Sequence, residues 1–306
     1  MGALMQLNNF IKEFLPSSKL QHDTTITYNQ CGNLKPISLE DLSLITPIKK
    51  RIITLRKNNN RVKLIREQKK LSLIVPYRHR EEHKKIFLPF IHNLLEKQKI
   101  DYEIIIAEQT DSFYFNRAKL MNIAALEAQK ESEYFIFHDI DALPIDVDYR
   151  YCNQTLKTYN YVKREKEFEL YPQTVFGGAT LVPKEIFYAI NGFSNNYWQW
   201  GKEDDDFLLR HLFKGYIPFL DTQGKLDMLP HPRALKTDQF GQQTDDKKIL
   251  QQNKNLSNKN KKYFSKFKRG IISQDDDGIN SIKNYTISSI ETVGKVKTVK
   301  IAFQEY

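Results

Sequence analysis

The feature that most constrains the fold is an alternation of short apolar runs with helical patterns in the middle of the chain. The runs at 71–77, 102–107 and 134–138 have the length and composition of buried strands. The segment 81–97 places apolar side chains on one helical face, and 116–129 is expected to form a second helix. This order is typical of an α/β fold with a parallel sheet covered by helices. Ligands of such sheets bind beyond the carboxyl ends of the strands, so the residues after each run are candidates for a site.

Charged side chains follow two of these predicted strands. Arg78 and Arg80 come after the first strand, and Asp139 and Asp141 come after the third. Carboxylates spaced in this way are typical ligands of Mg²⁺ or Mn²⁺, which also take oxygens from a substrate pyrophosphate. The two arginines, with Arg117, offer forked donors for phosphate oxygens. The alternatives are an acid pair that caps a turn and arginines that are solvated on the surface.

A block of aromatic and acidic residues at 197–206, YWQWGKEDDD, is expected to begin an amphipathic helix. Acids at a helix N-terminus are favoured by the helix dipole, which accounts for one or two of them. It does not account for four, nor for the chain's two tryptophans directly before them. Because aromatic faces stack on pyranose rings, a carboxylate beside them is also a candidate general base of a sugar site.

Composition places the chain among folded globular proteins, and its basic charge balance permits anionic partners such as nucleic acid, phosphosugars or a membrane surface without choosing among them. Hydrophobic residues make up 40% of the 306, and the charge balance is 47 − 37 = +10. The two cysteines, Cys31 and Cys152, cannot build a disulfide framework or a cysteine zinc site. No run approaches the roughly 18 apolar residues of a membrane span. A soluble protein from a reducing compartment is therefore expected.

Five motifs, taken in order, resemble the β1,4-galactosyltransferase family of animals and its bacterial relatives. They are VPYRHREEH (75–83), FNRAKLMN (115–122), FHDID (137–141), FGGA (176–179) and NGFSNNYWQWGKEDDD (191–206). The resemblance implies an α/β fold of the GT-A type, with a mostly parallel central sheet and helices on both faces. It also implies an inverting enzyme that uses Mn²⁺, or Mg²⁺ as the alternative, to move Gal or GalNAc from a UDP-sugar onto an acceptor sugar in β1,4 linkage.

The resemblance assigns roles to individual residues. Asp204 matches the catalytic base, and Asp141, Met228 and His231 match the metal ligands. Without the resemblance, Met228 and His231 would be read as ordinary packing or surface residues. The positions that match the donor site are Pro76, Tyr77, Arg78, Arg80, Arg117, Asp139, Ile140, Val175, Gly178 and Trp200, and those that match the acceptor site are Glu203, Asp205 and Trp200.

The same resemblance suggests how the chain is divided. Residues 1–70 form an N-terminal extension of unknown role, with a short helix expected at 4–15 and a basic surface stretch at 49–70. The transferase domain at 71–306 comprises a donor and metal half (71–150), an acceptor and catalytic half (151–240), and a basic loop with closing strands (241–306). Within the last part, 247–269 is expected to be a surface loop or partly mobile helix, and 287–303 the closing strands.

Departures from the family pattern carry further expectations. Gln199 and Lys202 stand where animal members often have glycine, so a mobile segment around Trp200 would move less freely. Cys152 matches a half-cystine whose partner position here is Tyr134, so that disulfide cannot form. The missing disulfide, together with the absence of a membrane anchor from the sequence, favours a bacterial-type cytoplasmic enzyme that builds surface glycans, with at most peripheral contact at the inner membrane face. A Golgi enzyme is the alternative if the chain is a piece of a longer secretory protein.

Val175 bears on the donor sugar. In the family, the residue before the Phe-Gly-Gly segment lies near the 2-position of the transferred sugar, and galactose-specific members commonly have Tyr there. The smaller side chain opens space for an acetamido group, so UDP-GalNAc is expected to serve at least as well as UDP-Gal.

Two rival functions remain open on the residues alone. The +10 charge and the Lys/Asn-rich stretch fit a nucleic-acid-binding protein, and the Asp-Ile-Asp motif fits a metal-dependent phosphoryl transferase or nuclease. The nucleic-acid-binding function leaves the WGKEDDD block at 200–206 unexplained. A UDP-sugar and a glycan acceptor, and no nucleic acid, are therefore the expected partners.

Overall fold

The computed structural model describes residues 34–36, 64–164, 167–170, 176–232 and 234–304. The helix predicted at 4–15, most of the basic stretch at 49–70 and Val175 lie outside the described residues. Within the described ranges, no helix is both long enough and apolar enough to cross a membrane.

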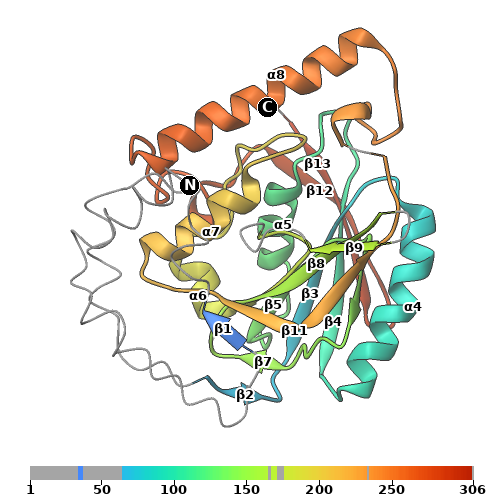
Figure 1. The fold of residues 1–306 in the computed structure, drawn as a ribbon, viewed down its shortest axis with the longest axis vertical. Coiled ribbons are helices and arrows are strands. Elements are labelled where there is room, and N and C mark those ends of the chain that lie inside the picture. The colour runs from blue at the N-terminus through green and yellow to red at the C-terminus, as the bar shows by residue number, and fades with distance from the viewer. Residues whose placement is uncertain (1–33, 37–63, 165–166, 171–175, 233, 305–306) are drawn as a thin grey trace.

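A sheet of eleven strands crosses the middle of the molecule (Figure 1). Its main path runs β1–β11–β8–β10–β5–β3–β4–β13–β12, with β6 beside β11 and β9 beside β8. The strands are Leu34–Pro36 (β1), Leu71–Tyr77 (β3), Tyr102–Gln109 (β4), Tyr134–His138 (β5), Ala142–Ile145 (β6), Leu156–Arg164 (β8), Glu167–Leu170 (β9), Ala179–Pro183 (β10), Phe219–Met228 (β11), Tyr285–Val293 (β12) and Val296–Phe303 (β13). A separate pair joins Arg66–Glu67 (β2) to Tyr151–Cys152 (β7).

Apolar layers on both faces of the sheet position the helices, as expected. Side chains of a strand alternate between the two faces, so Leu73 and Val75 of β3 pack with α4 (Glu81–Lys97), while Ile74 packs with α5 (Arg117–Leu126). The helices α6 (Lys184–Ala189) and α7 (Glu203–Phe213) complete the second layer. Short 3₁₀ turns lie at Ala234–Lys236 (η1) and Ile279–Ser281 (η2).

The strand directions correct one expectation, because the sheet is mixed rather than mostly parallel. The centre, β5–β3–β4–β13, is parallel. On its flanks, β10 pairs antiparallel with β5 and β8, and β12 pairs antiparallel with β13. The helices α4 and α5 supply the long crossovers that parallel neighbours need, whereas β12 and β13 are joined by a tight turn at Gly294, where φ is +59°.

The Lys/Asn-rich stretch expected as a loop or helix forms α8 (Lys247–Lys268), a helix along the upper edge of the view in Figure 1. The Asp246 side chain caps its start by accepting a hydrogen bond from the Lys248 N–H at 2.8 Å. One stripe of α8 is buried, and it consists of Asn253, Ser257, Asn260, Phe264 and Phe267. The phenylalanines pack near Leu209 of α7, which explains why so polar a segment is held against the domain.

Candidate active site

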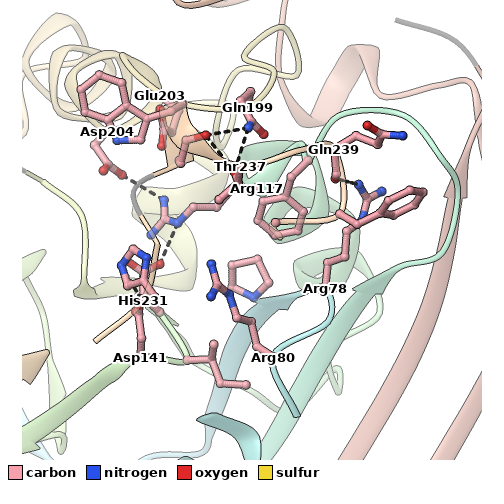
Figure 2. Close-up of a pocket in the computed structure, with 18 of the residues that line it drawn as sticks. Arg78, Arg80, Arg117, Asp141, Gln199, Glu203, Asp204, His231, Thr237 and Gln239 are labelled. Atoms are coloured by element: carbon pink, nitrogen blue, oxygen red, sulfur yellow. Dashed lines mark hydrogen bonds and ion pairs between the residues drawn. The ribbon is translucent and has the colours of Figure 1, made fainter. Parts of the chain in front are cut away.

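A cavity of about 300 Å³ lies beyond the carboxyl ends of the parallel strands, where α5 and α7 begin (Figure 2). This is the position that the strand order predicted. Most of the predicted site residues line it, namely Pro76, Arg78, Arg80, Arg117, Asp139, Ile140, Asp141, Trp200, Glu203, Asp204, Met228 and His231. Sequence-distant motifs therefore meet in one pocket.

The three candidate metal ligands meet at this pocket because β6 and β11 are paired. Their register sets Met228 opposite Ala142, next to Asp141, and the Leu229 N–H donates to the Asp141 main-chain oxygen at 2.7 Å. The turn after β11 then brings His231 back toward Asp141, as Figure 2 shows. A spacing of 90 residues in the chain thus becomes direct contact.

The geometry of this group suits a divalent ion. Asp141 Oδ2 and His231 Nε2 lie 3.0 Å apart, about the separation of neighbouring ligands around an octahedral ion with bonds near 2.1 Å. His231 Nδ1 lies 2.8 Å from the Pro232 carbonyl, which orients the ring and directs Nε2 at the site. The described residues contain no cluster of three or more His, Cys, Asp and Glu side chains suited to a metal. The set here is two such groups and the Met228 thioether, which favours Mn²⁺ over the harder Mg²⁺.

Asp141 and His231 lie within hydrogen-bond distance, and each favours the charged form of the other. Burial favours the neutral carboxyl and is the largest single influence, but the hydrogen bond and the charge of His231, with a backbone hydrogen bond and the charge of His83, together lower the pKa of Asp141. The hydrogen bond with Asp141 raises the pKa of His231 despite its partial burial.

Arg117, the first residue of α5, joins two candidate functional carboxylates. Its Nε donates to Asp139 Oδ1 at 2.7 Å and its Nη1 to Asp204 Oδ1 at 2.9 Å. Burial raises the pKa of Asp204, while the Arg117 charge opposes that rise. Burial also disfavours the guanidinium charge, but Asp139 and Asp204 outweigh it and raise the pKa of Arg117. Arg117 thus holds the candidate base, Asp204, in place while it also contacts Asp139, the acid that matches the donor site (Figure 2).

The Gly-Gly pair of the FGGA motif is explained by close packing on these acids. A Cβ on Gly177 would lie 2.3 Å from Asp204 Oδ2, so no larger residue fits there. Gly178 has a φ of +86°, and its N–H donates to Asp139 Oδ2 at 3.1 Å. Gly178 therefore acts on the pocket through its backbone, although it is not among the lining residues.

The four acids that begin α7 have different roles. Glu203 and Asp204 line the pocket, and burial together with the Asp204 charge raises the pKa of Glu203 to about 8. Asp205 does not line the pocket and forms an ion pair with Lys202 at 2.6 Å. Asp206 is fully buried and pairs with Arg210 at 2.5 Å, so it is structural.

The two tryptophans before these acids also have different roles. Trp200 is 52% exposed and lines the pocket, whereas Trp198 is 4% exposed and its ring packs edge-on against Phe303. Around Trp200 the backbone is left-handed at three residues, with φ of +64° at Gln199, +108° at Gly201 and +82° at Lys202. Glycine adopts such angles without strain, so the backbone at Gln199 and Lys202 has the conformation of the glycines that the resemblance leads one to expect there.

The arginines after β3 also have different roles. Arg78 is buried, and its guanidinium donates to the carbonyls of Phe113 (2.6 Å), Gln239 (2.6 Å) and Asp111 (2.9 Å). It shapes the wall of the pocket by tying these loops together. Arg80 reaches into the cavity in Figure 2 and is the better placed of the two for an anionic ligand.

Three predicted residues do not line the pocket, and one is not described. Tyr77 is buried in the layer that packs on α4, while Gly178 and Asp205 lie just outside the lining as given above. Other lining residues were missed, namely Phe115, Gln199, Ala234, Thr237, Gln239, Phe240 and Gly241. Phe115, a half-buried ring, could have been recognised because it directly precedes the Asn116 helix cap, but the segment 234–241 carries no motif.

Family models match both halves of the chain. The N-terminal region of glycosyl transferase group 7 matches residues 31–153, and the N-terminal domain of galactosyltransferase matches residues 160–232. β-1,4-galactosyltransferase 4 of Cricetulus griseus is 41% identical over 170 residues, which cover 54% of this chain and 49% of that protein. The chain belongs to the β1,4-galactosyltransferase family.

Other members of the family agree. β-1,4-galactosyltransferase 1 of Mus musculus is 38% identical over 181 residues, which cover 58% of this chain and 45% of that protein. This β1,4-galactosyltransferase family member thus spans about half the length of the curated relatives it matches. These relatives come from animals, so they do not support the expected bacterial surface glycan or a bacterial cytoplasmic location.

Solved structures confirm the GT-A type fold. The catalytic domain of Drosophila β1,4-galactosyltransferase 7, in complex with xylobiose, matches with a TM-score of 0.58 and 25% identity, covering 77% of this chain and 94% of that one. A mutant of the same enzyme in complex with manganese, UDP-Gal and xylobiose matches with the same TM-score and coverage at 24% identity.

Proposed function

We propose that this family member is an inverting, metal-dependent glycosyltransferase that moves Gal or GalNAc from a UDP-sugar onto a hydroxyl of an acceptor sugar in β1,4 linkage. One observation carries the proposal. In a single pocket, Arg117 links Asp139 to the candidate base Asp204, and the Asp141–His231 pair lies at the same pocket. An inverting displacement needs both groups, because the base must act on the acceptor while the leaving diphosphate is stabilised.

Asp141, Met228 and His231 would hold Mn²⁺, the metal present in the Drosophila complex. When bound, the ion supplies positive charge that neutralises the diphosphate leaving group. Arg80 projects into the same cavity and would add a forked donor to the phosphate oxygens. Phe115 would offer a ring face to the nucleotide base.

Asp204 would accept the proton of the acceptor hydroxyl. Its raised pKa brings it closer to neutral pH, which strengthens it as a base, while Arg117 keeps its carboxylate oriented. Glu203 and the exposed face of Trp200 would hold the acceptor, the former by hydrogen bonds and the latter by stacking. Asp205, held by Lys202, would contact the acceptor from the edge of the site.

The donor sugar is proposed from Val175. A side chain smaller than tyrosine leaves room for the acetamido group of GalNAc, so UDP-GalNAc should be used at least as efficiently as UDP-Gal. The test is the ratio of kcat/KM for the two donors in the natural protein and in Val175→Tyr. We expect the substitution to shift preference toward galactose. Strict galactose specificity of the natural protein would contradict the proposal.

The activity itself is tested by incubating the purified protein with UDP-Gal or UDP-GalNAc, Mn²⁺ and a panel of saccharide acceptors that includes xylobiose. UDP release and a β1,4-linked product are expected, and both should disappear with a chelator. Reactions without acceptor measure the background hydrolysis. Release of nucleotides from DNA or RNA, with no sugar transfer, would instead support the nuclease alternative.

A further inference from the structure

Lys157 is a buried lysine next to the candidate base, and no motif of the family covers it. It lies on β8, opposite Thr180 of β10 and Leu220 of β11, and its side chain is almost completely shielded from water. A lysine in such a position is costly unless its ammonium group has partners. Its Nζ donates a hydrogen bond to the Gly177 carbonyl.

That hydrogen bond places the ammonium group behind the two functional carboxylates. The peptide between Gly177 and Gly178 is held at both ends, because its carbonyl accepts from Lys157 and its N–H donates to Asp139 Oδ2 at 3.1 Å. The Cα of Gly177 in turn packs on the Asp204 carboxylate. A shift of Lys157 would therefore move the surface on which Asp204 rests.

We propose that Lys157 is a positioning residue for the transfer reaction, which holds the Gly177–Gly178 peptide against Asp204 and supplies a positive charge from beneath the site. The inference rests on the proposed function, since it assumes that Asp204 is the base. Lys157 does not line the cavity and acts through the peptide and through its charge, without touching substrate.

The charge has a defined direction of effect. Asp204 faces Arg117 from α5, Asp139 after β5, Lys157 from β8, and Glu203 and Asp205 of its own helix. Burial lowers the pKa of Lys157 to about 7, although the charges of Asp204 and Asp139 oppose that shift. Below neutral pH the lysine is charged and favours the Asp204 carboxylate. Removing Lys157 should raise the pKa of Asp204. As the pH is lowered, Asp204 would then be protonated earlier, so activity should start to fall at a higher pH than in the natural protein.

The experiment compares Lys157→Met and Lys157→Gln with the natural protein and with Lys119→Met. Lys157→Gln keeps a donor for the Gly177 carbonyl but removes the charge, and it also serves if Lys157→Met does not fold. Lys119 is a matched control, because it too is buried and donates to a main-chain carbonyl, that of Asn284 at 3.4 Å. The measurements are kcat against pH, thermal stability, and UDP affinity with Mn²⁺ present.

We expect the acid limb of the kcat profile to move to higher pH by about 1 unit in both Lys157 variants, with UDP affinity unchanged, and to stay in place in Lys119→Met. An unmoved limb in Lys157→Gln, or the same movement in Lys119→Met, would overturn the inference and leave Lys157 a packing residue. A natural protein that releases no UDP with any donor would overturn the proposed function instead, so the two failures are distinguishable.

Discussion

At the scale of single residues, the surroundings of the pocket favour the charged form of some acidic side chains and the neutral form of others. Asp141 and His231 favour each other's charged forms, and Arg117 donates hydrogen bonds to both Asp139 and Asp204. Burial and the Asp204 charge raise the pKa of Glu203 to about 8, which favours its neutral form near neutral pH. Adjacent acids at the start of α7 can therefore perform opposite tasks, one accepting a proton and the other donating a hydrogen bond.

Asp204→Asn tests the base. The amide keeps the shape of the side chain but cannot accept the acceptor's proton, so kcat should fall by about 10² to 10⁴-fold. UDP and Mn²⁺ should still bind with the natural affinity, which calorimetry measures. If nucleotide affinity instead fell in step with kcat, Asp204 would have to be reassigned to donor or metal binding.

Glu203→Gln tests whether Glu203, the neighbour of Asp204, is neutral in the folded protein. The readout is the pH dependence of thermal stability. The folded protein binds this proton more tightly than the unfolded chain, so the stability contributed by the neutral carboxyl is present at low pH. It is lost as the pH rises toward the folded pKa of about 8. The variant should match the natural protein near pH 5 and melt a few degrees higher near pH 8. A constant difference in Tm across this range would contradict the assignment.

At the scale of elements, the pocket depends on loops that α8 holds in place. Asn260 Nδ2 donates to the carbonyls of Trp198 (2.9 Å) and Trp200 (3.2 Å), and Asn253 Nδ2 donates to that of Thr237 (2.8 Å). Gln199 Nε2 donates to the Ala234 carbonyl at 3.0 Å, which joins the two loops directly. The polar half of the buried stripe of α8 is thus explained by the carbonyl groups beneath it.

Gln199 gives the prediction at this scale. Its left-handed backbone costs about 1–2 kcal/mol in a residue with a Cβ, and its side-chain hydrogen bond offsets part of that cost. Gln199→Ala keeps the strain without the bond and should lower the Tm, whereas Gln199→Gly should recover most of the loss. Limited proteolysis near Trp200 should be faster in both variants. Equal Tm values for the Ala and Gly variants would show that the backbone angle carries no strain.

At the scale of the molecule, one sheet connects segments from the whole described chain. β1 pairs with β11 at one edge, and the hairpin β12–β13 extends the parallel centre beside β4 at the other. The pocket lies beyond the middle of this sheet, and its lining includes the candidate metal ligand Met228 from β11 and acids from the start of α7. Occupation of the pocket should therefore stabilise the whole fold.

Metal and nucleotide binding tests this coupling. Mn²⁺ with UDP at about 100 times Kd should add about 2.7 kcal/mol of stability by mass action, which corresponds to a rise in Tm of several degrees. A chelator should reverse the Mn²⁺-dependent part. Asp141→Ala should abolish that part, and its Tm without ligand should fall only slightly, because the lost contact with His231 lies beside an open pocket where water can replace the carboxylate. A full Mn²⁺ response in Asp141→Ala would contradict the proposed metal site.

Local patterns in the sequence determined the central elements. The strands at 71–77 and 134–138 and the helix at 81–97 lie where they were predicted, because apolar periodicity reflects which side chains face the core. The position of the pocket followed from the same pattern, since parallel strands end at one edge. Motif resemblance then identified the family and its candidate residues.

Only the tertiary structure decided which of two similar residues enters the site. Arg80 and Trp200 reach the cavity, whereas Arg78 and Trp198 are buried by partners far along the chain. Lys157 carried no signal at all in the sequence, because its role arises from the packing of β8 against the Gly177–Gly178 peptide. Periodicity reports that a side chain is buried or exposed, but its partners depend on how distant segments pack, and that is set by the fold as a whole.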